Sequence, residues 1–249
     1  MDAPMKFSPR NAVVWRVVLA DLARQGMEPG DDDKRRIVDV GGGTGGFAVP
    51  LARAGYHVTV IDTSPNALAG LDRRAADAGV AERITGVQGD ADALPLLVEA
   101  GAATLVLCHS VLEMVESPRD ALRGIATALA PGGAASVLVA NRAGAVLARA
   151  LGGHVSTAAT LLSDPDGRVG PRDTLLRRFD PEPLERMIRE CGLEPELRHG
   201  VQVTADKAPG TVHGGEIAQN MIDFERELAS RSPYRDIATQ LHVLARKPR

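Results

Sequence analysis

Short apolar runs alternate with helical patterns along the first 140 residues of the chain. Each run is rich in Val, Ile or Leu, which is typical of a buried strand. These predicted strands cover residues 36–40, 57–61, 84–88, 104–108 and 135–140. Ser64-Pro65 and Pro118 are typical helix starts between them, because serine caps a helix and proline fits its first position. The repeat of strand and helix predicts an α/β fold with a parallel sheet between layers of helices.

The pattern changes in the second half of the chain. A helix is predicted at 143–151, followed by a polar stretch rich in Gly, Pro and Asp, and another helix at 184–190. Residues 196–204 and 239–246 alternate like strands, with an amphipathic helix predicted at 214–230 between them. These last two strands suit an antiparallel pair at the edge of the sheet.

Length and composition fit one globular domain. A chain of 249 residues with 44% hydrophobic residues can bury a substantial core. We expect a single domain over 1–249, with an N-terminal helix over the cofactor in 1–30 and rim or lid insertions at 141–178 and 205–236. Two cysteines do not predict a disulfide framework, and we find no signal peptide or membrane-spanning run. A cytoplasmic protein is expected, without a membrane partner.

The most informative segment is RIVDVGGGTGG, residues 36–46. Here a predicted strand leads through five glycines into a predicted helix that begins at Phe47. Glycines permit a tight turn and leave bare N–H groups and the positive end of the helix facing a ligand. The segment therefore predicts a binding loop for a nucleotide-like ligand.

This loop fits two cofactor patterns. One is the dinucleotide fingerprint G-x-G-x-x-G, which begins at Gly41. The other is D-x-G-x-G-x-G, which begins at Asp39 and is typical of class I S-adenosylmethionine (SAM) methyltransferases. In that family the acidic residue faces the cationic amino-acid end of the cofactor. The cofactor contacts expected from this loop are Asp39, Gly41, Gly42 and Gly43.

Further candidates follow the next three predicted strands, because a parallel sheet binds its ligand at the carboxyl ends of its strands. Asp62, followed by Thr63, closes the second strand, and its carboxylate can accept hydrogen bonds from both hydroxyls of a ribose. Ala91 and Asp92 follow the third strand, where SAM enzymes contact the adenine. His109 follows the fourth, nearest the expected reaction centre. A loop or capping acid is the alternative interpretation for either aspartate.

The end of this half of the chain favours SAM over NAD. Pro131-Gly132-Gly133 between a predicted helix and a strand is typical of class I methyltransferases, and two further strands complete their sheet. A dehydrogenase of this length more often carries a Tyr-x-x-x-Lys pair, which does not occur. We expect a Rossmann-like class I methyltransferase fold, a seven-stranded mostly parallel sheet with one antiparallel C-terminal strand. The expected product of the cofactor is S-adenosylhomocysteine (SAH).

Over nearly its whole length the chain also resembles the bacterial tRNA carboxymethoxyuridine methyltransferases of the CmoM/SmtA type. The segments that carry the likeness are 10–15, 38–45, 109–115, 129–133 and 242–248. The resemblance implies that Arg10 reaches SAM, that Ala91 and Asp92 contact the adenine, and that His109 lies against the cofactor. A basic and aromatic run of the family is replaced here by 202–206, which leaves the substrate open.

Three residues are candidates for catalysis: His109, Asn141 and Tyr234. His109 can orient a nucleophile, take its proton near neutral pH, or contact SAM. Asn141 ends the fifth predicted strand, where it can bind substrate or cap the strand end, and Tyr234 can help to hold an anionic substrate. Glu113 is expected on a helix surface or in a lid. The dispersed histidines and the absence of C-x-x-C predict no metal.

Two classes of methyl acceptor stay open. The resemblance implies the carboxylate of a tRNA wobble uridine, and a small metabolite methylated on oxygen or nitrogen is the alternative. A carboxylate needs no general base, but it needs a cation. Candidate cations are Arg142, Arg177, Arg178 and Arg235. A net charge of −3 and few aromatic residues argue against RNA. A SAM-binding module without catalysis is a lesser alternative, and the oligomeric state is not predicted.

Overall fold

The computed structural model describes residues 11–27, 36–204 and 215–249. Its strands are β1 (Arg36–Val40), β2 (His57–Asp62), β3 (Ile84–Gln88), β4 (Ala103–His109), β5 (Leu129–Ala140), β6 (Glu194–Val201) and β7 (Gln240–Arg246). Its α-helices are α1 (Ala12–Arg24), α2 (Ala48–Arg53), α3 (Pro65–Asp77), α4 (Leu94–Leu97), α5 (Pro118–Ala128), α6 (Arg142–Leu151), α7 (Val155–Ser163), α8 (Pro181–Glu190) and α9 (Gly215–Ala229).

These strands form one sheet in the order β3-β2-β1-β4-β5-β7-β6. The pairs from β3 to β5 are parallel, and β7 is antiparallel to both β5 and β6. The expected class I methyltransferase sheet, including its single antiparallel strand, is confirmed. The order reverses between β1 and β4, so that a crevice opens where the strand ends diverge.

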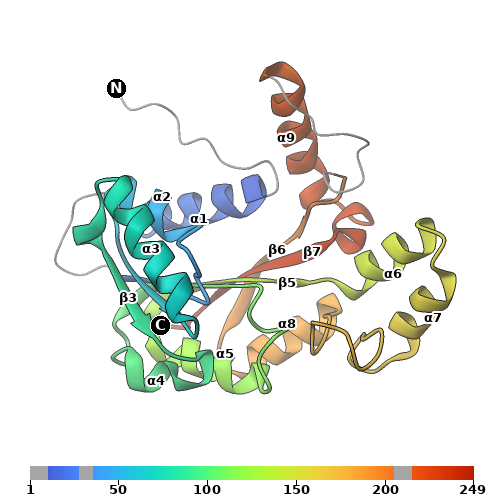
Figure 1. Ribbon diagram of the computed structural model, residues 1–249, viewed down its shortest axis with the longest axis horizontal. Helices are drawn as coiled ribbons and strands as arrows, with labels where there is room; N and C mark the ends of the chain where they lie inside the picture. The colour runs from blue at the N-terminus through green and yellow to red at the C-terminus, as the bar shows by residue number, and fades with distance from the viewer. Residues whose placement is uncertain (1–10, 28–35, 205–214) are drawn as a thin grey trace.

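Helices cover both faces of the sheet (Figure 1). Successive side chains of a strand point to opposite faces of the sheet, so each strand contributes to two hydrophobic cores. Leu105 and Leu107 of β4 pack with residues of α1 to α3, whereas Val106 and Cys108 pack with residues of α5 and α8. Residues 105–108 of β4 are completely buried on one face or the other, so the middle of the strand is apolar. A rigid double core thus holds the strand ends in place.

The helix starts predicted at Ser64-Pro65 and Pro118 are correct. The Ser64 hydroxyl accepts a hydrogen bond from the Ala67 N–H at 3.2 Å, and α3 begins at Pro65. Ser117 and Pro118 start α5 in the same way. The helix that begins at Pro118 was expected to continue to Ala130, up to Pro131, but it ends at Ala128 because the chain already enters β5 at Leu129. The segment 131–133 therefore lies in the irregular first part of a strand, with Gly132 at φ 80°.

The expected polar loop after α6 contains a further helix, α7. Only Gly152, Gly153 and His154 separate α6 from α7, and the two helices pack against each other at one end of the molecule (Figure 1). Ala158 and Leu161 are the buried residues of α7. Within the described ranges, no helix is long and apolar enough to cross a membrane.

Candidate active site

A cavity of about 570 Å³ lies at the carboxyl edge of the sheet. It is lined by residues 40–41 of β1 and its loop, 61–63 after β2, 89–92 after β3, and 110–111 with 114–116 after β4. Its volume is in the range of small-molecule sites. The structure thus brings together Gly41, Asp62, Thr63, Ala91 and Asp92 of the predicted cofactor contacts.

The glycine loop closes one end of this cavity in a conformation that side chains would obstruct. Gly41 has φ 68°, and a Cβ there would lie 2.4 Å from the Val111 side chain. At Gly42 a Cβ would lie 2.6 Å from the Asp39 carboxylate. Both spacings are shorter than van der Waals contact, so the loop's shape depends on glycine.

Asp62 is fixed at the cavity by two backbone donors. The Gly43 N–H donates to Oδ2 and the Ser64 N–H donates to Oδ1, both at 2.9 Å. A carboxylate has about four lone-pair positions, so acceptor capacity remains on each oxygen. Asp62 therefore links the glycine loop to the start of α3 and still offers oxygens to a ligand.

Asp39 lies beneath the glycine loop with 3% of its surface exposed. Its Oδ2 has no hydrogen-bond partner in the described part of the chain. Burial raises the pKa of this carboxyl to about 7, and the nearby charge of Asp62 adds to the shift. A buried carboxylate without a partner is costly unless a cation approaches it.

The cavity is acidic. Asp62, Asp90, Asp92 and Glu116 line it, and the described lining residues include no Lys or Arg. Burial, with the charge of Asp90 as a smaller cause, raises the pKa of Asp92. SAM carries a sulfonium and an ammonium group, whereas NAD carries an anionic pyrophosphate. The electrostatics of the cavity therefore suit SAM. Asp90 and Glu116 were not anticipated, although the position of Asp90 two residues after the predicted strand 84–88 was a usable signal.

His109 does not line the cavity but lies directly before Ser110, which does. Its Nε2 lies 2.8 Å from the Ser136 hydroxyl, and its ring meets the Phe47 ring edge-on at 4.5 Å between centroids. Burial lowers the pKa of His109 to about 3. The ring is therefore neutral at pH 7 and a weak base, which argues against the expected proton transfer near neutral pH.

Glu113 is buried, which corrects the expectation of a surface acid. Its Oε1 accepts a hydrogen bond from the Ala140 N–H at 3.2 Å, and burial raises its pKa to about 7. The Leu176 N–H donates to the Glu113 carbonyl at 2.9 Å. Glu113 thus ties the cavity wall after β4 to the end of β5 and to the segment 164–178.

Asn141 is completely buried and its amide is occupied within the protein. It donates to the carbonyls of Asp236 and Ala238 and caps α6 by accepting from the Ala143 N–H. Substrate binding by Asn141 would break these bonds, so the structure favours the capping alternative.

Tyr234 is 46% exposed at the start of a 3-10 helix before β7. Arg10 lies outside the described residues.

The four arginines expected to hold an anionic substrate are bound within the protein, which corrects that expectation. Arg177 donates to carbonyls of the cavity wall at residues 112, 115 and 116. Arg178 pairs with Asp173, and Arg142 donates to the carbonyls of residues 164 and 165. Arg235 donates to Ser230 and approaches Asp236. Arg168 and Arg172, in the same segment, form no ion pair in the described part of the chain.

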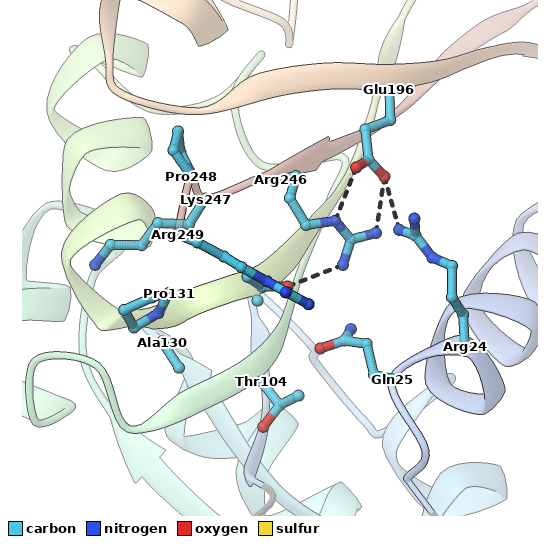
Figure 2. A pocket seen from close by; sticks show the side chains of 12 residues that line it. Arg24, Gln25, Thr104, Ala130, Pro131, Glu196, Arg246, Lys247, Pro248 and Arg249 are labelled. Carbon is cyan, nitrogen blue, oxygen red and sulfur yellow. Dashed lines mark hydrogen bonds and ion pairs between the residues drawn. The ribbon is translucent and has the colours of Figure 1, made fainter.

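A second cavity, of about 400 Å³, lies at the opposite, amino edge of the parallel strands (Figure 2). Arg24 of α1 and Arg246 of β7 both point toward Glu196 of β6, at 2.7 and 2.8 Å. Arg246 also pairs with the buried Asp21. These ion pairs attach α1 to the last two strands, so this cavity is a structural junction.

No group of three metal-ligating side chains that could hold an ion occurs in the ranges 11–27, 36–204 and 215–249.

Comparisons with known proteins agree with this geometry. Residues 38–137 match the family described as a methyltransferase domain. The tRNA 5-carboxymethoxyuridine methyltransferase of Escherichia coli K12 is 26% identical over 96% of this chain and 88% of its own length. A ubiquinone biosynthesis O-methyltransferase of Ralstonia nicotianae is 32% identical over 68% of this chain and 66% of its own. The crystal structure of magnesium protoporphyrin IX methyltransferase from Synechocystis, with bound SAH, has the same fold, with TM-score 0.61, 15% identity, and 99% and 90% coverage.

Proposed function

We propose that this chain, which belongs to the class I SAM-dependent methyltransferases, transfers the methyl group to a carboxylate oxygen of a wobble uridine in tRNA. The observation that carries the proposal is that the alignment with a tRNA-modifying relative extends across 96% of the chain. The ubiquinone-type relative matches only 68% of the chain.

The cofactor's orientation follows from the polar groups of the cavity. The Asp62 oxygens would accept hydrogen bonds from the ribose hydroxyls, and Ala91 and Asp92 would contact the adenine. The glycine loop would carry the amino-acid end, with its ammonium group near the unpartnered Oδ2 of Asp39. SAM supplies a methyl group that its sulfonium already activates, so the protein's task is alignment, worth ~7–11 kcal/mol in favourable cases.

The ionisable residues of the cavity wall bear on the choice of methyl acceptor. Among the described lining residues, the cavity has no His, Lys or Tyr, and its only ionisable side chains are four carboxyl groups, which are weak bases for a neutral hydroxyl. A carboxylate acceptor is ionised at pH 7 and needs no such base. It would be held by cations that are not already paired, and Arg168 and Arg172 meet this condition, in the segment tied to the cavity wall through Glu113.

A second candidate is O-methylation of an apolar small molecule. Leu151, Val155 and Leu162 are 72%, 66% and 66% exposed on α6 and α7. Exposed apolar residues on one projecting element suit an apolar ligand or partner. The partial match to ubiquinone-type relatives supports this alternative.

The test uses purified full-length protein, SAM and two acceptors. One is a synthetic anticodon stem-loop with 5-carboxymethoxyuridine at the wobble position, and the other is a catechol with an apolar tail. Mass spectrometry should show a gain of about 14 mass units on the modified nucleoside and none on a stem-loop with unmodified uridine. Methylation of the catechol alone would replace the RNA proposal by the second candidate.

A further inference from the structure

Four polar side chains form a row across the sheet on the face that α1 covers. They are His109, Ser136, His242 and His199, from the neighbouring strands β4, β5, β7 and β6. Ser136 Oγ lies 2.8 Å from His109 Nε2 and 2.9 Å from His242 Nε2. The rings of His242 and His199 lie 5.8 Å apart between centroids. The row reaches the carboxyl edge at His109, one residue before the cavity wall.

The hydrogens in this row can be counted. Both rings next to Ser136 are neutral, because burial lowers the pKa of His109 to about 3 and that of His242 well below its usual value. A neutral imidazole has one N–H, and a hydroxyl has one hydrogen. Ser136 can therefore donate to one ring only, and the other ring must donate to Ser136. The two histidines consequently hold opposite tautomers.

The surroundings of His242 decide which ring donates. His242 is completely buried, and its Nδ1 has no hydrogen-bond partner in the described residues. If His242 accepted from Ser136, its hydrogen would lie on Nδ1 as a buried, unbonded donor. If His242 donates instead, the hydrogen of His109 lies on its own Nδ1, which is also without a partner, so either assignment leaves one buried N–H for a ligand to complete. His109 is only partly buried and directly precedes a residue of the cavity wall, whereas His242 is completely buried, so a ligand can reach the N–H of His109 but not that of His242. His242 therefore donates through Nε2, and Ser136 donates to Nε2 of His109.

We propose that Ser136 and His242 are positioning residues that hold His109 as the Nδ1–H tautomer, so that it offers a hydrogen-bond donor at the carboxyl edge of the sheet. Nδ1 of His109 is buried, with no partner in the described part of the chain, so an oxygen of the cofactor or of the methyl acceptor would complete it. This inference rests on the proposed function only for the identity of the acceptor.

Long-range ¹⁵N–¹H spectra of histidine-labelled protein report the tautomer directly and require no substrate. We expect His109 to carry its hydrogen on Nδ1 and His242 on Nε2. Ser136→Ala should change the His109 ring shifts, whereas His242→Gln, whose amide can still donate near the Nε2 position, should preserve them. An Nε2–H tautomer of His109, or a tautomer that is unchanged in Ser136→Ala, would overturn the proposal. If the tautomers are as expected but the stem-loop is not methylated, only the proposed function fails.

Binding and kinetic measurements show whether the oxygen that accepts from His109 Nδ1 belongs to the cofactor or to the methyl acceptor. If the cofactor accepts from Nδ1, Ser136→Ala should raise the Kd for SAM about twofold to tenfold, as expected for one hydrogen bond. If the methyl acceptor does, the Kd stays constant and kcat/KM for the stem-loop falls by the same factor. Thr127→Ala, which removes an exposed hydroxyl of α5 outside both the row and the cavity wall, should change neither. Equal Kd and kcat/KM in Ser136→Ala and wild type would contradict the positioning role.

Discussion

The two edges of the sheet use charge in opposite ways. At the amino edge, Arg24 and Arg246 both donate to the Glu196 carboxylate (Figure 2). Both arginines also pair with the buried Asp21. At the carboxyl edge, carboxyl groups gather around a cavity without described cations, and the Oδ2 of Asp39 lacks a partner. Unpaired buried polar groups cost stability, so a fold retains them where a ligand completes them. Paired charges therefore mark the structural edge, and unpaired charges mark the functional one.

The largest expected effect is on stability at the amino edge. Arg246→Met would remove one of the two arginines that pair with the Asp21 carboxylate, whose side chain is only 1% exposed. Removing one partner of a buried pair costs about 3 kcal/mol. Urea unfolding should show that loss while calorimetry gives an unchanged Kd for SAM. A Kd that rises along with the loss of stability would show that the two edges are coupled.

Asp62→Ala, at the carboxyl edge, should weaken SAM binding rather than lower the stability of the fold. It removes a charged acceptor for the ribose hydroxyls, which is worth about 1.5–3 kcal/mol, so the Kd for SAM should rise by at least tenfold. Asp77→Ala, on the exposed side of α3, serves as the matched control. Wild-type affinity in Asp62→Ala would remove this strand end from the cofactor site.

The affinity for SAM should depend on pH through Asp39. Its pKa of about 7 in the free protein should fall when the cofactor's ammonium group approaches, because the cation favours the ionised carboxylate. Binding is therefore strongest above pH 7 and weakens as the pH falls below 7, by at most tenfold per unit. Calorimetry between pH 5.5 and 8 tests this, and Asp39→Asn isolates any titration of the ligand. The same pH slope in both proteins would contradict the role of Asp39.

The smallest effect is expected for the arginines that have no ion pair. Exposed ion pairs contribute roughly 0.2–1 kcal/mol, so Arg168→Ala should raise the KM for the carboxylate-bearing stem-loop by less than about sixfold. The Kd for SAM should not change. Arg149→Ala, on the exposed surface of α6, is the control. If both variants behave alike, the segment 164–178 does not hold the acceptor's charge.

The fold could be predicted because its signals are local. Ser64-Pro65 starts α3 by contacts within four residues, and the glycine loop follows directly from β1. The second helix of the α6–α7 pair was missed because Gly152-Gly153 has the composition of a loop, although only residues 152–154 interrupt the helical pattern. Helix and strand identity follow from neighbours in sequence, whereas the extent of a loop depends on packing.

Site residues were harder to predict, because a polar residue's role depends on distant partners. Two adjacent arginines, Arg177 and Arg178, are typical of a site that binds an anion. In the structure, however, Arg177 donates to backbone carbonyls of the loop after β4, and Arg178 forms an ion pair with Asp173. Glu113 is a buried link rather than a surface acid. A usable signal existed for the histidine row: Ser136 and His242 are single polar residues inside otherwise apolar strands.

A crystal structure of the protein with SAH tests the central claim most directly, because it shows which edge of the sheet binds the cofactor. We expect the ribose hydroxyls to lie about 2.6–3.2 Å from the Asp62 oxygens. The adenine should lie beside Ala91 and Asp92, and the ammonium group should lie over Asp39. Cofactor density at the amino edge among Arg24, Arg246 and Glu196, or a ribose without contact to Asp62, would contradict the assignment.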